Sequence, residues 1–165
     1  MKTLRNLAVL ALAIATITLN SCKKKDEKPS YSITATVDGK VTNFNTNAAA
    51  VSATVQGLSL TTITGQASDG STISILLDAT PTAGKTYIST AANQEDQAIL
   101  ELSTSTDDFI NDDTSSNVVT VTVNSVSATA VQGTFKGGLV STTVGNGTPA
   151  TKSVTNGTFN VSYSK

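Results

Sequence analysis

Four aspartates and one asparagine gather within seven residues of this chain. They are Asp107, Asp108, Asn111, Asp112 and Asp113. Carboxylate and amide oxygens are hard ligands that suit Ca²⁺, which takes about 6–8 oxygens. The order of residues differs from an EF-hand loop, because the central glycine and the final glutamate are missing. The cluster therefore predicts either a calcium site or a charged surface loop that keeps sheet edges from pairing with other chains.

Hydrolytic chemistry has few candidate residues. The absence of histidine excludes the usual Ser-His and Cys-His nucleophiles. A glycosidase needs two carboxylates that face each other across a cleft. The candidates for such a pair are Asp78, Glu95, Asp96 and Glu101. The chain has no tryptophan to form a sugar platform, and its lysines lie in no motif typical of a Ser-Lys dyad. We therefore predict no catalytic residues, with these acids solvated at strand ends and in loops.

The only cysteine, Cys22, ends the sequence Leu19-Asn20-Ser21-Cys22. This sequence resembles the lipobox of bacterial lipoproteins, in which a leucine, any residue and a small residue precede the cysteine. The thiol of a lipobox cysteine receives a diacylglycerol group. Cleavage between the small residue and the cysteine, here Ser21 and Cys22, frees an amine for a further acyl chain such as palmitate. Several acyl chains anchor a protein stably where one would be marginal. The alternative is an ordinary secreted protein with a stray cysteine.

The segments around Cys22 agree with this interpretation. Lys2 and Arg5 precede an apolar run over residues 7–19, which is too short to span a bilayer comfortably and is typical of a signal peptide. Residues 22–30 are charged, contain a proline and lack apolar periodicity, as expected for a flexible tether. We predict a signal peptide helix over residues 1–21, a lipidated cysteine and tether over 22–30, and a single β-rich domain over 31–165.

The charge of the domain limits its partners. Residues 31–165 contain five lysines, ten acidic residues and no arginine, which gives a net charge of −5. Nucleic-acid binding depends on a basic surface that contacts phosphates. The composition therefore predicts no nucleic-acid partner.

Apolar residues alternate with threonine and serine along most of the domain, as in half-buried β-strands. Asp38-Gly39 lies between two such segments and is a strong signal for a type I′ hairpin. The segment from Leu58 to Thr64 changes its alternation, which predicts a bulge near Thr61 and Thr62. We interpret residues 104–117, which contain the acidic cluster, as one long loop. The pattern predicts an antiparallel β-sandwich or flattened barrel of about 8–10 strands.

Two tetrapeptides near the end of the chain are alike. Gln132-Gly133-Thr134-Phe135 and Asn156-Gly157-Thr158-Phe159 share the pattern Gly-Thr-Phe. Two short matches do not make a repeat protein. We expect neighbouring strands with similar phenylalanine positions.

Several of these short patterns together resemble an uncharacterised family of Bacteroidota outer-membrane and surface lipoproteins. They are Val37-Asp38-Gly39-Lys40 with Phe44, Ile63-Thr64-Gly65, the step from Gly84 to Tyr87, and the two Gly-Thr-Phe segments with Asn160 and Val161. The resemblance implies a β-rich domain held by lipid at the outer membrane, on its periplasmic or its surface face. The run Lys23 to Lys28 also resembles the export tag of surface lipoproteins in that group. The resemblance implies no catalytic or binding residues.

The expected function follows from these observations. We predict a lipid-anchored envelope protein whose non-enzymatic β domain binds an unknown protein or glycan partner or has a structural role. A glycan-active or small-molecule-binding protein and a calcium-dependent adhesion module are the alternatives. We expect no cofactor apart from the calcium ion of the acidic cluster.

Overall fold

The computed structural model describes residues 30–90, 97–112, 117–143 and 148–164. The described residues contain strands and no helix, which confirms the all-β prediction. The predicted signal peptide helix and most of the tether lie outside these residues. The strands are β1 (Ser32–Val37), β2 (Lys40–Asn43), β3 (Thr46–Val55), β4 (Leu58–Gln66), β5 (Thr72–Leu77), β6 (Thr86–Ile88), β7 (Ala98–Ser103), β8 (Asp108–Ile110), β9 (Thr120–Val126), β10 (Ala130–Ser141) and β11 (Thr151–Tyr163).

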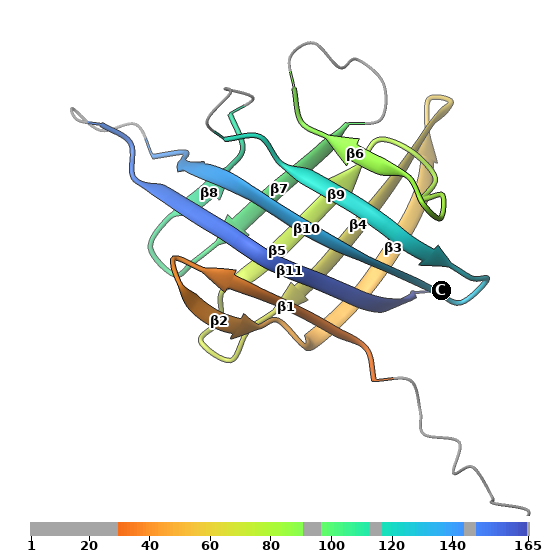
Figure 1. The fold of residues 1–165 in the computed structure, drawn as a ribbon, viewed down its shortest axis with the longest axis horizontal. Helices are drawn as coiled ribbons and strands as arrows, with labels where there is room; N and C mark the ends of the chain where they lie inside the picture. Colours follow the sequence, from red (N-terminus) through yellow and green to blue (C-terminus); the bar gives the residue numbers. More distant parts are fainter. Residues whose placement is uncertain (1–29, 91–96, 113–116, 144–147, 165) are drawn as a thin grey trace, which may run out of the picture.

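The strands form two layers that are joined into one sheet (Figure 1). One layer has the order β2-β1-β11-β10-β9-β6, and the other has the order β3-β4-β5-β7-β8. β11 leaves β1 near its C-terminal end and pairs with β3, while β10 leaves β9 and pairs with β8. These two corners close the sheet into a flattened barrel. All pairings are antiparallel except the short contact between β11 and β3.

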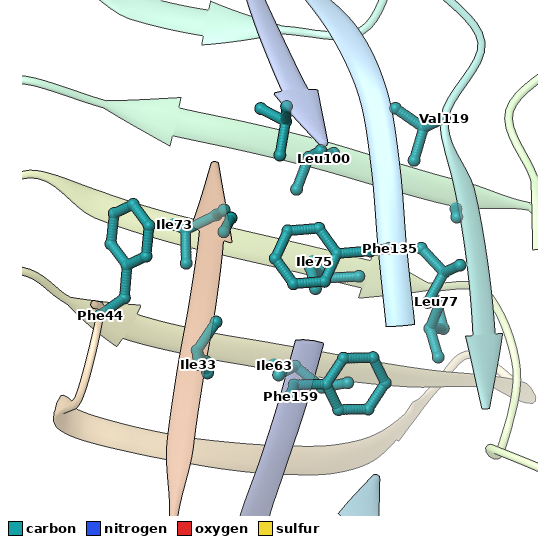
Figure 2. Close-up of a cluster of buried hydrophobic side chains, with 14 of the residues drawn as sticks. Ile33, Phe44, Ile63, Ile73, Ile75, Leu77, Leu100, Val119, Phe135 and Phe159 are labelled. Atoms are coloured by element: carbon teal, nitrogen blue, oxygen red, sulfur yellow. The ribbon is translucent and has the colours of Figure 1, made fainter. Parts of the chain in front are cut away.

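The core lies between the two layers. Figure 2 shows Ile33 and Phe159 of the first layer facing Ile63, Ile73 and Ile75 of the second. Four of these five side chains have no exposed surface, and Phe159 is 2% exposed. Removal of such apolar side chains from water is the main driving force for folding. The alternation of apolar and polar residues in the sequence therefore reflects one face toward the core and one toward solvent.

The two Gly-Thr-Phe segments lie side by side on β10 and β11, as expected. In the antiparallel register Gly133 is opposite Phe159, and Phe135 is opposite Gly157. A Cβ atom at Gly133 would collide with the Phe159 ring and with the backbone oxygen of Thr122, and one at Gly157 would lie 2.7 Å from the Phe135 ring. Each phenylalanine therefore fills the space that the opposite glycine leaves. The two rings are 6.4 Å apart between centroids and are tilted by 32°, a separation typical of favourable aromatic pairs.

The predicted hairpin at Asp38-Gly39 is confirmed. The φ angles of these residues are 48° and 82°, as a type I′ turn requires. Gln56 and Gly57 have similar φ angles of 52° and 87° and form a second hairpin turn of this kind between β3 and β4.

Two expectations were wrong in detail. Residues 104–117 are not one loop, because β8 pairs with both β7 and β10, and the described residues thus contain eleven strands. Phe109 is 5% exposed and its burial holds this segment against the core. The register of β4 is continuous through Thr61 and Thr62, so the predicted bulge is absent there. Thr61 points inward instead, and its hydroxyl is hydrogen-bonded to Ser52 Oγ at 2.8 Å.

Among the described residues no helix has the length and hydropathy needed to cross a membrane.

Replacement of Gly133 by alanine tests the packing of the two central strands. The added methyl group has no space between Thr122 and Phe159, so we expect the free energy of unfolding to fall by about 1–3 kcal/mol. Thr134→Ala, on the exposed face of the same strand, serves as the control and should change it by about 0.5 kcal/mol or less. Urea unfolding followed by circular dichroism measures both. Equal stabilities for Gly133→Ala and the wild type would contradict the packing described above.

Candidate functional site

A cleft opens at the end of the barrel where three turns come together. They are the β1–β2 hairpin, the β4–β5 turn and the β7–β8 turn, joined by the beginning of β11. The cleft has a volume of about 450 Å³. Its lining contains hydroxyl, carboxylate and ammonium groups above an apolar floor: Val37, Asp38, Lys40, Thr42, Phe44, Asp69, Ser71, Leu102, Thr104, Ser105 and Lys152. The floor is rigid because Phe44 and Leu102 are buried in the core.

Asp38 joins the β1–β2 hairpin to the beginning of β11. Its carboxylate accepts a hydrogen bond from Lys152 Nζ at 2.8 Å and another from the backbone N–H of Ser153 at 2.9 Å. Its own backbone N–H donates to the Ser153 carbonyl at 2.9 Å. The hydrogen bond from Lys152, followed by that from Ser153, lowers the pKa of Asp38 below its ordinary value. Asp38 is therefore a carboxylate at neutral pH.

Lys152 has a second neighbour. Its ammonium lies 5.5 Å from the centroid of the Phe109 ring, within the range of a cation–π interaction. Lys152 thereby connects the β1–β2 hairpin to β8, which lies in the other layer of the barrel.

Asp69 forms the second acidic position of the cleft. Its carboxylate accepts hydrogen bonds from Ser71 Oγ at 2.6 Å and from the Ser71 backbone N–H at 3.0 Å, which is the geometry of an Asx turn. These hydrogen bonds, with a smaller contribution from the positive charge of Lys40, lower the pKa of Asp69. The cleft thus presents two carboxylates and two ammonium groups, Lys40 and Lys152, from three separate parts of the chain.

The residues of the acidic cluster have separate surroundings. Asp107 accepts hydrogen bonds from Ser141 Oγ at 2.5 Å and Thr143 Oγ1 at 2.6 Å. These two bonds lower its pKa and fasten the β7–β8 turn to the end of β10. Asp108 is exposed at the start of β8.

The remaining members of the cluster differ from one another as well. Asn111 is 8% exposed, and its side-chain oxygen accepts a hydrogen bond from the Leu100 backbone N–H at 2.8 Å. Asp112 accepts one from Asn117 Nδ2 at 2.9 Å. Asp113 lies outside the described residues. In the part of the chain that the structure describes, no three acidic, histidine or cysteine side chains come close enough to hold a metal ion. The calcium site therefore remains a prediction from the sequence.

Of the carboxylates considered for a glycosidase, the two that the structure describes, Asp78 and Glu101, do not line the cleft. Asp78 is exposed just after β5, and Glu101 is exposed in the middle of β7. Glu95 and Asp96 lie outside the described residues. The same is true of Ser21 and Cys22, the predicted cleavage and lipidation residues, so lipidation remains a prediction too.

The sequence indicated a hairpin turn at Asp38, and it did not indicate that Asp38 and Asp69 line one cleft. An aspartate followed by glycine is so common in turns that it carries no signal for a binding site. Lys152 is 114 residues from Asp38 along the chain, and no local pattern relates the two. Only the pairing of β1 with β11 brings them together.

Comparisons with known proteins give no match: no family model, curated protein or solved structure is similar to this chain.

Replacement of Asp38 by asparagine tests the ion pair at the cleft. Asparagine keeps an oxygen for Ser153 and tolerates the positive φ angle, so the variant mainly removes the charge. We expect the free energy of unfolding at pH 7 to fall by about 1 kcal/mol or less, since the pair is partly exposed.

The effect should depend on pH in a defined direction. The pKa of Asp38 in the folded protein lies below its ordinary value of 3.8. The stabilisation is therefore complete above that ordinary value and disappears as the pH falls through the folded-state pKa. Urea unfolding of both proteins as a function of pH measures the difference, with Asp78→Asn as a control for loss of surface charge. A difference that grows on acidification would contradict the assigned ion pair.

Proposed function

We propose that this chain is a lipid-anchored lipoprotein of the bacterial cell envelope whose β domain binds short glycans without chemical change. The anchor is Cys22, acylated on its thiol and, once cleavage after Ser21 has freed its amine, on that amine as well. The proposal places the protein at the outer membrane, on its periplasmic or its surface face, as in the Bacteroidota lipoproteins that its sequence resembles.

The observation that carries the binding proposal is the composition of the cleft. Hydroxyl groups of Thr42, Ser71 and Thr104 line it beside the charged groups of Asp69 and Lys40. Ligand sites generally combine an apolar floor with a few convergent polar groups. A mixture of donors and acceptors of this kind suits a ligand that carries many hydroxyl groups, and the paired charges suit acidic or amino sugars.

The position of the tether also supports a binding role. The tether enters the domain at Ser30, whose carbonyl accepts a hydrogen bond from Asn160 Nδ2, just before β1. The cleft lies at the other end of β1, beside Asp38. A strand of six residues is about 20 Å long. Ser30, where the tether meets the domain, and the cleft are therefore at opposite ends of the first strand, an arrangement that suits a domain held by its N-terminal side (Figure 1 shows β1).

The chemistry of the cleft favours binding over hydrolysis. A glycosidase requires a general acid whose pKa is raised, so that it is protonated near neutral pH. Hydrogen bonds lower the pKa of both cleft carboxylates, Asp38 and Asp69. Neither group is therefore suited to donate a proton to a leaving oxygen.

Metabolic labelling with palmitate tests the anchor. Cells that produce the wild-type chain should incorporate the label into it, and Cys22→Ala should abolish incorporation because no thiol remains to be acylated. Ser21→Ala keeps a small residue before the cysteine and should label like the wild type. Equal labelling of Cys22→Ala and the wild type would refute the lipid anchor.

Titration with sugars tests the cleft. A panel of neutral, acidic and amino disaccharides at about millimolar concentration should shift the amide resonances of Lys40, Ser71 and Thr104 in NMR spectra. Lys40→Gln should weaken the strongest binder several-fold, because hydrogen bonds to charged groups are the stronger ones. Lys136→Gln, outside the cleft, should leave the affinity unchanged. If no sugar of the panel shifts these resonances, the proposed ligand class is wrong.

A further inference from the structure

The second half of β3 has a different environment from the first. β11 pairs with β3 only at Ala49 and Ala50, and the last contact is a hydrogen bond from the Ser164 N–H to the Ala50 carbonyl at 2.8 Å. Residues Val51–Val55 continue beyond this point and pair with β4 alone. All five are exposed. The hairpin of β3 and β4 extends to the upper right in Figure 1, and its outer edge pairs with no strand within the residues that the structure describes.

The backbone groups at this edge can be assigned from the strand geometry. The Ala50 carbonyl points toward β11, and the direction alternates from residue to residue along a strand. The register between Ala50 and Val55 is continuous. The N–H and C=O groups of Ser52 and Thr54 therefore point outward along the open edge, while those of Val51, Ala53 and Val55 point toward β4.

The side chains on one face beside this edge are apolar, and the hairpin carries no charge. Val51 is 48% exposed, Val55 is 52% exposed and Leu58, which is opposite Val55 on β4, is 69% exposed. No charged residue occurs between Lys40 and Asp69 in the sequence. A two-stranded hairpin is marginally stable in water unless further strands or packing support it. The exposed apolar face and the lack of charge therefore suit the hairpin to pair with a further β-strand.

The two ends of the sheet order are protected in the way that natural proteins usually protect edges. β2 has four residues and begins with Lys40. β6 has three residues and follows Lys85. Short strands and lysines prevent pairing with other chains. The Val51–Val55 edge has neither protection, so it is the edge in the described fold that is suited to pair.

We propose that two copies of this chain associate by antiparallel pairing of their Val51–Val55 edges. In this pairing the backbone N–H and C=O groups of Ser52 form hydrogen bonds with those of Thr54 in the second copy. Thr54 of the first copy pairs in the same way with Ser52 of the second, which gives about four hydrogen bonds. Ala53 then faces Ala53 of the second copy across a two-fold axis. A neutral, β-branched edge is best matched by another neutral edge, and a second copy supplies one.

The side chains are self-complementary in this register. Val51 is opposite Val55 of the second copy, on the same face as Ala53. The apolar strip that includes Leu58 and Leu60 therefore continues from one copy to the other without a charge. A two-fold pairing uses the same edge in both copies and leaves no edge for a third, so the association ends at a dimer.

Disulfide cross-linking in the full lipidated chain tests the register. Ala53 and its counterpart form a non-hydrogen-bonded pair, with Cα atoms about 4.5 Å apart, within the range that a disulfide spans. Ala53→Cys should therefore give a covalent dimer under mild oxidation in membranes. Thr54→Cys is the matched control: its counterpart is offset by two residues along the strands, beyond disulfide reach, and it should remain monomeric. The wild-type chain, oxidised in the same way, serves as a second control and measures any cross-link that forms through Cys22.

Three results would overturn the proposal: an Ala53→Cys chain without cross-link, equal cross-linking of Thr54→Cys, or a wild type that is monomeric at about 100 µM in detergent. The proposal would also be overturned if the wild type were a monomer that binds lipid vesicles or another protein through this hairpin.

A second measurement avoids new cysteines. Ala53→Lys places a charge on the two-fold axis and should convert the dimer to a monomer in analytical ultracentrifugation. Thr158→Lys adds the same charge on the exposed face of β11 and should leave the dimer intact. A dimer that survives Ala53→Lys would place the contact elsewhere and contradict the proposal. Circular dichroism confirms that each variant is folded.

Discussion

The pairing of β10 with β11 is the interaction on which the rest of this structure depends. Each strand takes part in both layers, since β11 reaches β3 and β10 reaches β8. The two long strands can lie close together because a glycine faces a phenylalanine at two successive inward positions. A larger residue at either glycine would separate the strands or displace a ring from the core. Closure of the barrel thus relies on the absence of two side chains.

The cleft is a consequence of this closure. β11 begins at Thr151, and its second residue, Lys152, lies where the turns of both layers meet. The ion pair with Asp38 holds the first hairpin of the domain to its last strand. Asp107 performs a similar role nearby, because Ser141 and Thr143 bind its carboxylate. Acidic side chains at this end of the barrel therefore fasten loops to strands, and exposed groups such as Lys40 are the ones available to a ligand.

Two parts of the surface have opposite characters. The cleft is polar and charged, and it lies at the end of β1 away from Ser30. The β3–β4 hairpin is apolar and uncharged, and its open edge suits another strand. A protein attached to a membrane by lipid is confined to two dimensions, where neighbouring copies meet frequently. Both proposals are therefore compatible: pairing through the hairpin leaves the cleft of each copy accessible, because no cleft residue belongs to Val51–Leu60.

The sequence by itself determined the local features of this protein. Alternating threonine and aliphatic residues predicted strands, because a half-buried strand has a period of two. Asp38-Gly39 predicted a hairpin, because a type I′ turn requires positive φ at both central positions and this dipeptide tolerates it. The resemblance of Leu19–Cys22 to a lipobox is likewise a local pattern, and the lipidation of Cys22 stays a prediction. The short strand β8 was missed, because three residues in an acidic segment show no period. Its pairing and the burial of Phe109 are visible only in the structure.

The tertiary structure alone decided which distant residues meet. Asp38 and Lys152 share no sequence pattern, and their contact follows from the register of β1 on β11. The meaning of the two Gly-Thr-Phe segments became clear only when the strands were seen to be antiparallel neighbours. The open edge of β3 was equally hidden, because its residues have the composition of an ordinary strand. Within the described residues β11 pairs with β3 only at Ala49 and Ala50, and a sequence pattern with a period of two holds no information about where two paired strands separate.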